Sequence, residues 1–375
     1  MTINRDAADW STYTPQRKNV FINGDFSIWQ RGIAIKNVGN AGYAADRIQA
    51  LAIGGGAIDF GASTEHPFIS NNGSPNKSAT CMFITPNVAD ASLGTTDHYG
   101  FQSSIEGYAF RALYQQTCTL SFWVRSTVAG TYYVSFTNTG APPSHSYVSA
   151  YTVDTASTWE KKSITFIPGV AGQGDFEFGA AEGLRIRWSL GAGTSFQTGT
   201  LDQWQAGNFR EGTSGVNFMN SVSNTFRITD IQLEVNHEAT DFDRRPIQEE
   251  LLLCQRYFQT NANVNAAQED GLANISVPPA VVYTTTLMRS DNRFQVPMRA
   301  NPDITFFAPV SGDGGSPESH AQWSYYISPT WFSATATSAV NVSQKGFVAQ
   351  LTGTGVTAGN SHLCLGTWTA AAEMV

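Results

Sequence analysis

One Gly- and Gln-rich segment, TLDQWQAGNFREGTSG (200–215), combines an aromatic side chain with amide and guanidinium groups. An indole face packs against the apolar side of a sugar ring, and neighbouring polar groups hydrogen-bond the sugar hydroxyls. We therefore predict a glycan-binding site here and around Tyr147. The candidate residues are Trp204, Gln205, Arg210 and Tyr147, with Gln203 and Asn208 as further polar groups.

Two alternatives compete with this interpretation of the loop. Trp204 would instead be a packing anchor, because most tryptophans are largely buried. In the second alternative, the recognition surface lies in the C-terminal part of the chain, around Trp323, Tyr325 and Trp331.

Catalytic motifs are missing from the sequence. It contains no GxSxG, HExxH or GxxxxGK[ST] pattern, and its six histidines are scattered. Glycan cleavage needs two carboxylates about 5–10 Å apart. Asp175/Glu177 and Asp241/Asp243 are spaced for one strand face, but most pairs with this spacing lie on solvated strand edges. We predict that the chain is not an enzyme.

The composition and net charge of the chain argue against two classes of binding partner. The 375 residues carry a net charge of −8 and no run of Lys or Arg, so we expect neither nucleic acid nor an anionic membrane as a partner. No stretch approaches the roughly 18 apolar residues of a membrane helix, and the polar N-terminus does not resemble a signal peptide. The four cysteines lie far apart, which predicts buried, reduced thiols.

Alternation of apolar and polar residues indicates β-strands throughout. In 184–190, Leu184, Ile186, Trp188 and Leu190 alternate with polar residues, as in a strand with one buried face. Similar runs occur at 119–125 and 131–137, with turn-rich segments between them. In 226–235 the alternation changes phase, which predicts a β-bulge near Asp230.

One amphipathic helix interrupts the strands at PIQEELLLCQRYF (246–258), where Ile247, Leu251, Cys254 and Phe258 form an apolar stripe. Strand patterns return after it. We predict an all-β protein: an N-terminal jelly-roll β-sandwich, one connecting helix and a smaller C-terminal β-sandwich. The expected boundaries are 1–18 for a lead or attachment segment, 19–245 for the jelly roll, 246–259 for the helix and 260–375 for the C-terminal domain.

Several segments together resemble a group of bacteriophage tail-fibre or receptor-binding proteins. The most specific is FRITDIQLEVNHEATDFDRRPIQEELLLCQRYF (226–258), and NVFINGDFSIWQRG (19–32), FQVPMRANP (294–302) and WTAAAEM (368–374) accompany it in order. The first domain also resembles jelly-roll carbohydrate-binding modules that begin near NGDFS and end near a TDIQL strand.

These resemblances imply a location on the virion, after synthesis in the host cytoplasm, and a homotrimer. They imply two partners: host cell-surface polysaccharide, and other virion proteins bound through the N-terminal segment. They also imply a structural calcium ion between the first and last strands of the jelly roll, at Asp25 and Asp230, although Ser27 replaces the usual Glu. The alternatives are a purely structural virion component (baseplate, neck or capsid fibre) and a polysaccharide-degrading enzyme.

Overall fold

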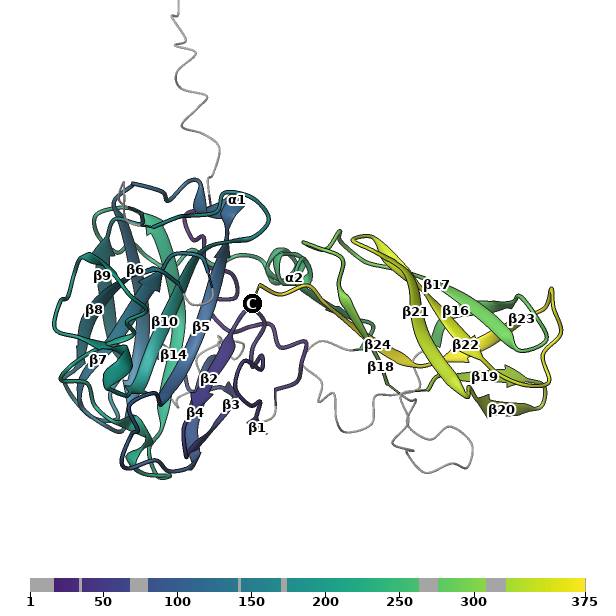
Figure 1. Ribbon diagram of the computed structural model, residues 1–375, viewed down its shortest axis with the longest axis horizontal. Coiled ribbons are helices and arrows are strands. Elements are labelled where there is room, and N and C mark those ends of the chain that lie inside the picture. The colour runs from purple at the N-terminus through teal and green to yellow at the C-terminus, as the bar shows by residue number, and fades with distance from the viewer. Residues whose placement is uncertain are drawn as a thin grey trace, which may run out of the picture.

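The computed structural model describes residues 17–33, 36–67, 80–140, 143–169, 174–262, 276–307 and 322–374. It shows two β-lobes joined at helix α2 (Figure 1). The predicted all-β class, with two β-sandwich lobes, is confirmed. Residues 1–16 of the predicted attachment segment lie outside the described ranges. Among the described residues, no helix is long and apolar enough to cross a membrane.

The N-terminal lobe consists of two six-stranded sheets. In order across the first sheet, the strands are β1 (Lys36–Asn37), β3 (Ala57–Ser63), β4 (Cys81–Val88), β14 (Phe226–Val235), β6 (Cys118–Ser126) and β9 (Glu160–Phe166). Across the second sheet they are β12 (Trp204–Ala206), β8 (His145–Val153), β7 (Gly130–Thr137), β10 (Glu182–Ala192), β5 (His98–Glu106) and β2 (Gln49–Ile53). Shorter elements are helix α1 (Gly107–Phe110), strands β11 (Gln197–Thr198) and β13 (Glu211–Gly212), and 3-10 turns at Thr194–Phe196 and Phe218–Asn220.

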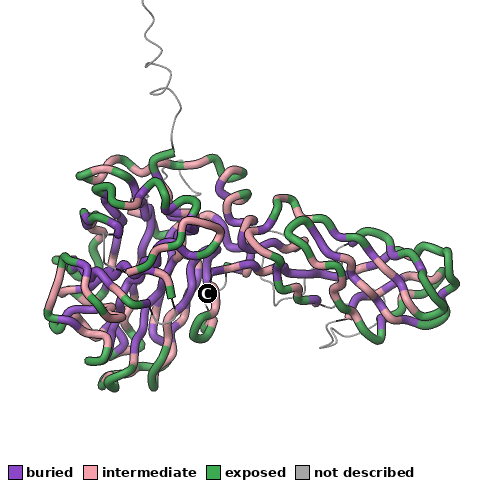
Figure 2. Tube along the Cα trace, turned by 45° about the horizontal axis from the view of Figure 1, so that its top comes forward, coloured by how far each residue is buried: buried purple, intermediate pink, exposed green. Residues whose placement is uncertain are grey.

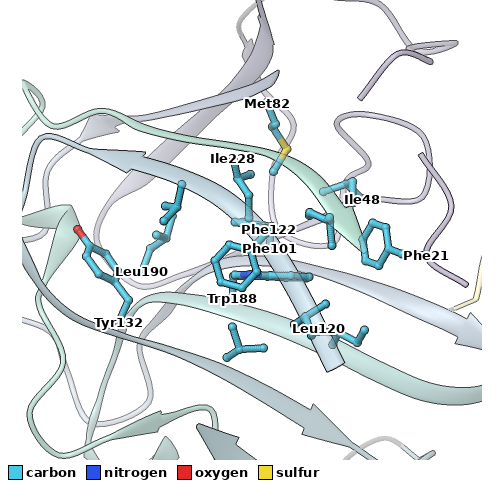
Figure 3. Packing of buried hydrophobic residues seen from close by; sticks show 14 of the residues in the cluster. Phe21, Ile48, Met82, Phe101, Leu120, Phe122, Tyr132, Trp188, Leu190 and Ile228 are labelled. Atoms are coloured by element: carbon cyan, nitrogen blue, oxygen red, sulfur yellow. The ribbon is translucent and has the colours of Figure 1, made fainter. Parts of the chain in front are cut away.

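The core between the two sheets is centred on Trp188 of β10. Its ring stacks on Phe101 at a centroid distance of 5.0 Å and meets Phe122 edge-on at 5.9 Å (Figure 3). The apolar alternation of the strands predicted this, because residues of one parity share one face. Buried residues are concentrated inside each lobe, and strands of the C-terminal lobe also carry exposed residues (Figure 2). The four cysteines are buried and free, as predicted.

The predicted bulge in β14 is confirmed. The pairing of β14 with β6 shifts register between Thr229 and Gln232, and Asp230 has a φ of 51°. The bulge makes room for the N-terminal segment, whose Gly24 carbonyl accepts a hydrogen bond from the Ile231 N–H at 2.9 Å. The start and the end of the jelly roll therefore lie together.

Helix α2 (Ile247–Gln255) is shorter than predicted and buries a different face. Cys254 is fully buried, but Ile247 is 47% exposed, so the predicted apolar stripe is only partly correct. Glu250 is buried instead, because its carboxylate accepts hydrogen bonds from the Asn23 N–H and from Arg245. Phe258, predicted to end the helix, begins strand β15 (Phe258–Thr260).

The C-terminal lobe has a core of its own between a seven-stranded and a three-stranded sheet. The large sheet runs β20 (Thr330–Ser333), β19 (Ser324–Ile327), β23 (Ser361–Leu365), β16 (Ser276–Val282), β17 (Leu287–Arg293), β22 (Gly346–Thr352) and β21 (Ala336–Ser343). The small sheet runs β15, β24 (Thr367–Ala371) and β18 (Asp303–Phe307). Trp323 and Tyr325, two of the three alternative recognition residues, are buried in this core, so neither ring offers a sugar platform. The third, Trp331 of β20, is partly exposed.

Buried charges connect the two lobes. The guanidinium of Arg47 pairs with the carboxylate of Glu373, and Arg31 pairs with the same carboxylate at 3.1 Å. Arg256, just after α2, pairs with Glu106 of β5 at 2.5 Å. The Glu373 pairs attach the last described residues to the N-terminal lobe, and the Arg256 pair attaches the segment after α2 to β5.

Candidate functional site

The structure places Trp204 and Tyr147 in the core and not on an exposed loop. Trp204 begins the edge strand β12, where it pairs with Tyr147 of β8, and each residue is 8% exposed. The indole N–H donates to the Ile167 carbonyl at 2.8 Å, and the ring lies edge-on to Phe176 at 5.6 Å. The predicted exposed indole is therefore wrong, because strand pairing at the sheet edge turns this ring inward.

The Gln205 side chain makes two hydrogen bonds within its own segment. Its side-chain oxygen accepts a hydrogen bond from the Thr198 hydroxyl at 2.8 Å, and its amide donates to the Thr200 carbonyl at 2.8 Å. Gln203 is exposed beside it. These contacts stabilise segment 193–216. The segment folds back over the second sheet on the side away from the core. We call that side the outer face.

The outer face of β10 is polar and yet buried. Arg185, Arg187 and Ser189 point there and are 7%, 3% and 7% exposed. Across the neighbouring strand β7, Arg187 lies opposite Ser135, and Arg185 lies opposite Thr137. Cross-strand partners share one face of a sheet, so guanidinium and hydroxyl groups gather on this outer face.

A row of hydrogen bonds crosses this face from strand to strand. The Gln102 amide of β5 donates to Gln49 of β2, and Arg187 Nε donates to Gln102 Oε1 at 2.9 Å. Arg187 Nη1 then donates to Asn208 Oδ1 in the overlying segment at 2.8 Å. We call Gln49, Gln102, Arg187 and Asn208 the polar ladder. It holds planar amide and guanidinium groups in fixed positions, as selective recognition of sugar hydroxyls requires.

A second charged pair lies next to the ladder. Arg185 makes two hydrogen bonds to the carboxylate of Glu182, at 2.7 and 2.5 Å. Ser104 donates a further hydrogen bond to the same carboxylate. Arg185 is therefore neutralised by Glu182.

Arg210 follows Asn208 by two residues in segment 193–216 and is half-buried. Its guanidinium carbon lies 4.1 Å from the centroid of the Phe196 ring, and that ring also meets His98 edge-on at 4.9 Å. Burial, together with the charges of Arg210 and Arg187, lowers the pKa of His98 to about 4. His98 is therefore neutral at physiological pH, and the positive charge of this region belongs to arginines.

The same segment buries a carboxylate. Glu211 in β13 is 3% exposed and accepts a hydrogen bond from Ser189 Oγ at 2.5 Å. Burial raises its pKa to about 7. Glu211 lines a pocket of about 270 Å³ together with Gln197 and Asn217.

Asp25 and Asp230, the predicted calcium ligands, do come together, but at an arginine. Arg244 contacts Asp25 at 3.4 Å and Asp230 at 3.1 Å, and the His66 ring lies 3.5 Å from Asp230. Calcium takes six to eight oxygen ligands. A guanidinium and an imidazole beside two carboxylates do not fit that donor set. In the described ranges, no group of three or more His, Cys, Asp or Glu residues is placed to hold a metal ion.

Comparisons with known proteins give only distant similarities. No family model and no curated protein matches the chain. Among solved structures, a family 11 carbohydrate-binding module of a Clostridium thermocellum cellulase has 15% identity and a TM-score of 0.29, over 56% of this chain and 98% of the module. A putative sugar-binding protein from Bacteroides thetaiotaomicron has 11% identity and a TM-score of 0.33, over 58% of this chain and 100% of that one.

A third similar structure is the enzymatically active domain of tailspike protein 4 of bacteriophage CBA120. It has 9% identity and a TM-score of 0.32, over 58% of this chain and 21% of that one. Neither family membership nor function follows from similarities this distant. The functional case for this chain therefore rests on its own residues.

The residues that sequence reasoning missed are Arg187, Gln102 and Gln49. One signal was present: Arg185 and Arg187 alternate with apolar residues in one strand, so they had to share a face. Such residues usually face solvent. The segment that covers them, 193–216, comes after β10 in the chain, and no local pattern indicates where it folds.

Proposed function

We propose that the chain is a non-catalytic glycan-binding protein of a virus particle, and that the glycan binds at the outer face of the second sheet. The polar ladder is the observation that carries the proposal. Its four side chains come from β2, β5, β10 and segment 193–216, and they form one continuous hydrogen-bonded row. Asn208, at its end, is half-buried and so reaches solvent.

The ladder suits a sugar because its groups are already fixed before binding. Planar amides and guanidiniums donate and accept in defined directions, and little side-chain freedom remains to be lost on binding. The half-buried rings of Phe196 and Phe209 lie in the same segment and offer apolar surface for a pyranose face.

Glycan binding is tested with the full chain on an array of purified bacterial surface polysaccharides. We expect binding to at least one, and we expect Asn208→Ala to weaken it by about tenfold, because the variant removes the outermost group of the ladder. The matched control is Asn87→Ala, an exposed asparagine of the first sheet. Equal binding by Asn208→Ala and the parent would place the site elsewhere.

The proposed virion location is supported by the sequence segment 226–258 and its resemblance to phage fibre proteins. Antibody labelling of virus particles in electron micrographs tests it. Labelled particles combined with no binding on the array would favour the purely structural role. Release of reducing ends from a bound polysaccharide would instead identify an enzyme.

We also propose that the chain assembles as a homotrimer through its C-terminal lobe. Apolar side chains are exposed there: Val281 is 47%, Tyr283 61% and Leu363 55% exposed. Burial of such side chains in a closed assembly is favourable. Light scattering should return three times the chain mass at micromolar concentration, and a monomer would refute the trimer.

A further inference from the structure

Two arginines at the polar ladder have no carboxylate in direct contact among the described residues. Arg185 has Glu182, but the partners of Arg187 are the neutral side chains of Gln102 and Asn208. Arg210 stacks on Phe196, and its Nε and Nη1 atoms are buried without a hydrogen-bond partner. Within the described parts of the chain, neither Arg187 nor Arg210 forms an ion pair.

Burial makes this arrangement costly. Arg187 is 3% exposed, and a charge removed from water is stable only when it is paired and hydrogen-bonded. Burial and the nearby charges of Arg210 and Arg185 together lower the pKa of Arg187 well below its usual value, and the more weakly acting Glu182 carboxylate does not offset them. Both guanidinium groups are therefore electrostatically unfavourable in the free protein. A bound anion would stabilise both of them.

Hydroxyl groups on the same face also lack partners. Ser135 lies opposite Arg187, and Thr137 lies opposite Arg185. Both side chains are fully buried, and neither hydroxyl has a hydrogen-bond partner among the described residues. Buried polar groups without a protein partner usually hydrogen-bond to an ordered water or a bound ligand.

The positive charge that could attract an anion is confined to the outer face. The whole chain has a net charge of −8, so its overall field repels polyanions. Glu211, the buried acid of the same segment, is bonded to Ser189 and forms no ion pair with either arginine. An acidic ligand would therefore be held by this site and not by general attraction.

We propose that the glycan bound at the outer face is acidic, and that a carboxylate of a uronic acid or similar sugar lies against the guanidinium groups of Arg187 and Arg210. This inference rests on the proposed glycan binding. A carboxylate is favoured over a compact point charge because the planar guanidinium fork matches its two oxygens. Hydroxyls of the same sugar would meet Asn208 and the other polar groups of the ladder.

The experiment uses the polysaccharide captured on the array and its carboxyl-reduced derivative, in which each uronic acid becomes a neutral sugar. Calorimetry with the full chain should show at least about tenfold tighter binding of the native form, because a charge-assisted hydrogen bond is lost on reduction. Arg210→Gln should abolish that preference, and Arg210→Lys should retain part of it.

Arg289→Gln is the matched control, because Arg289 also stacks on an aromatic ring, with its guanidinium carbon 4.6 Å from the Tyr283 ring centroid in the C-terminal lobe. The Arg289→Gln variant should still bind the native polysaccharide more tightly than the carboxyl-reduced one. Equal affinity for native and reduced polysaccharide would overturn the acidic-ligand inference while glycan binding stands. Tighter binding of a glycerol-phosphate polymer would overturn the choice of carboxylate. Failure to bind any array member would instead refute the proposed function itself.

Discussion

At the scale of single residues, Trp204 shows how strand pairing changes a side chain's role. Its ring is part of the core, and its N–H bonds the Ile167 carbonyl. Trp204→Ala should therefore lower the free energy of unfolding by about 3–5 kcal/mol, as large-to-small core changes do. Trp204→Phe should retain most of the stability. Chemical denaturation measures both variants, and a Trp204→Ala variant as stable as the parent would contradict the burial of the ring.

Glu211 makes stability depend on pH. Its pKa is about 7 in the folded protein against an ordinary 4.5. The folded state therefore holds the proton more tightly than the unfolded state. Stability is unaffected below pH 4.5, falls as the pH rises from 4.5 to 7, and stays lower above that range. The loss is about 3 kcal/mol.

Glu211→Gln removes this titration and can still accept the hydrogen bond from Ser189. We expect the variant to be more stable than the parent at pH 8 and no more stable at pH 4. Denaturation of both proteins at the two pH values isolates the effect, because other titrating groups are common to both. A difference that does not change with pH would exclude Glu211 as its source.

At the scale of elements, the pairing of the N-terminal segment with the bulge of β14 depends on one glycine. A Cβ added at Gly24 would lie 2.1 Å from the Ile231 carbonyl oxygen, which is backbone and cannot move aside cheaply. Gly24→Ala should destabilise the N-terminal lobe by about 1–3 kcal/mol, the usual range for overpacking. Gly179→Ala is the control, since a Cβ there meets no atom within 4 Å. Thermal melting of the two variants should separate them clearly.

At the scale of the whole molecule, the buried charges between the lobes hold the end of the chain in place. Glu373→Ala would leave Arg47, whose side chain is 2% exposed, without its carboxylate. Removing one partner of a buried pair typically costs about 3–5 kcal/mol. Asp291→Ala is the control, because the Arg293–Asp291 pair is 74% and 56% exposed and should contribute under about 1 kcal/mol. Equal unfolding free energies for the two variants would show that the lobes do not depend on this contact.

The sequence by itself determined the strand class, the bulge near Asp230 and the existence of α2. Each is a local property, because alternation and helical spacing record which face of an element is apolar. The core positions of β10, such as Trp188 and Leu190, followed from the same pattern. The sequence also placed Arg210 and Asn208 in a segment that reaches the candidate site.

Only the tertiary structure decided which other residues belong to that site. Arg187 and Gln102 lie 85 residues apart and meet because β10 pairs with β5. Trp204 turned inward because its segment became an edge strand, and Asp25 and Asp230 met at Arg244 because the bulge and the N-terminal segment lie together. Strand order and loop packing are non-local, so no window of sequence contains them. For that reason the polar ladder and its unpaired arginines appear only in the folded chain.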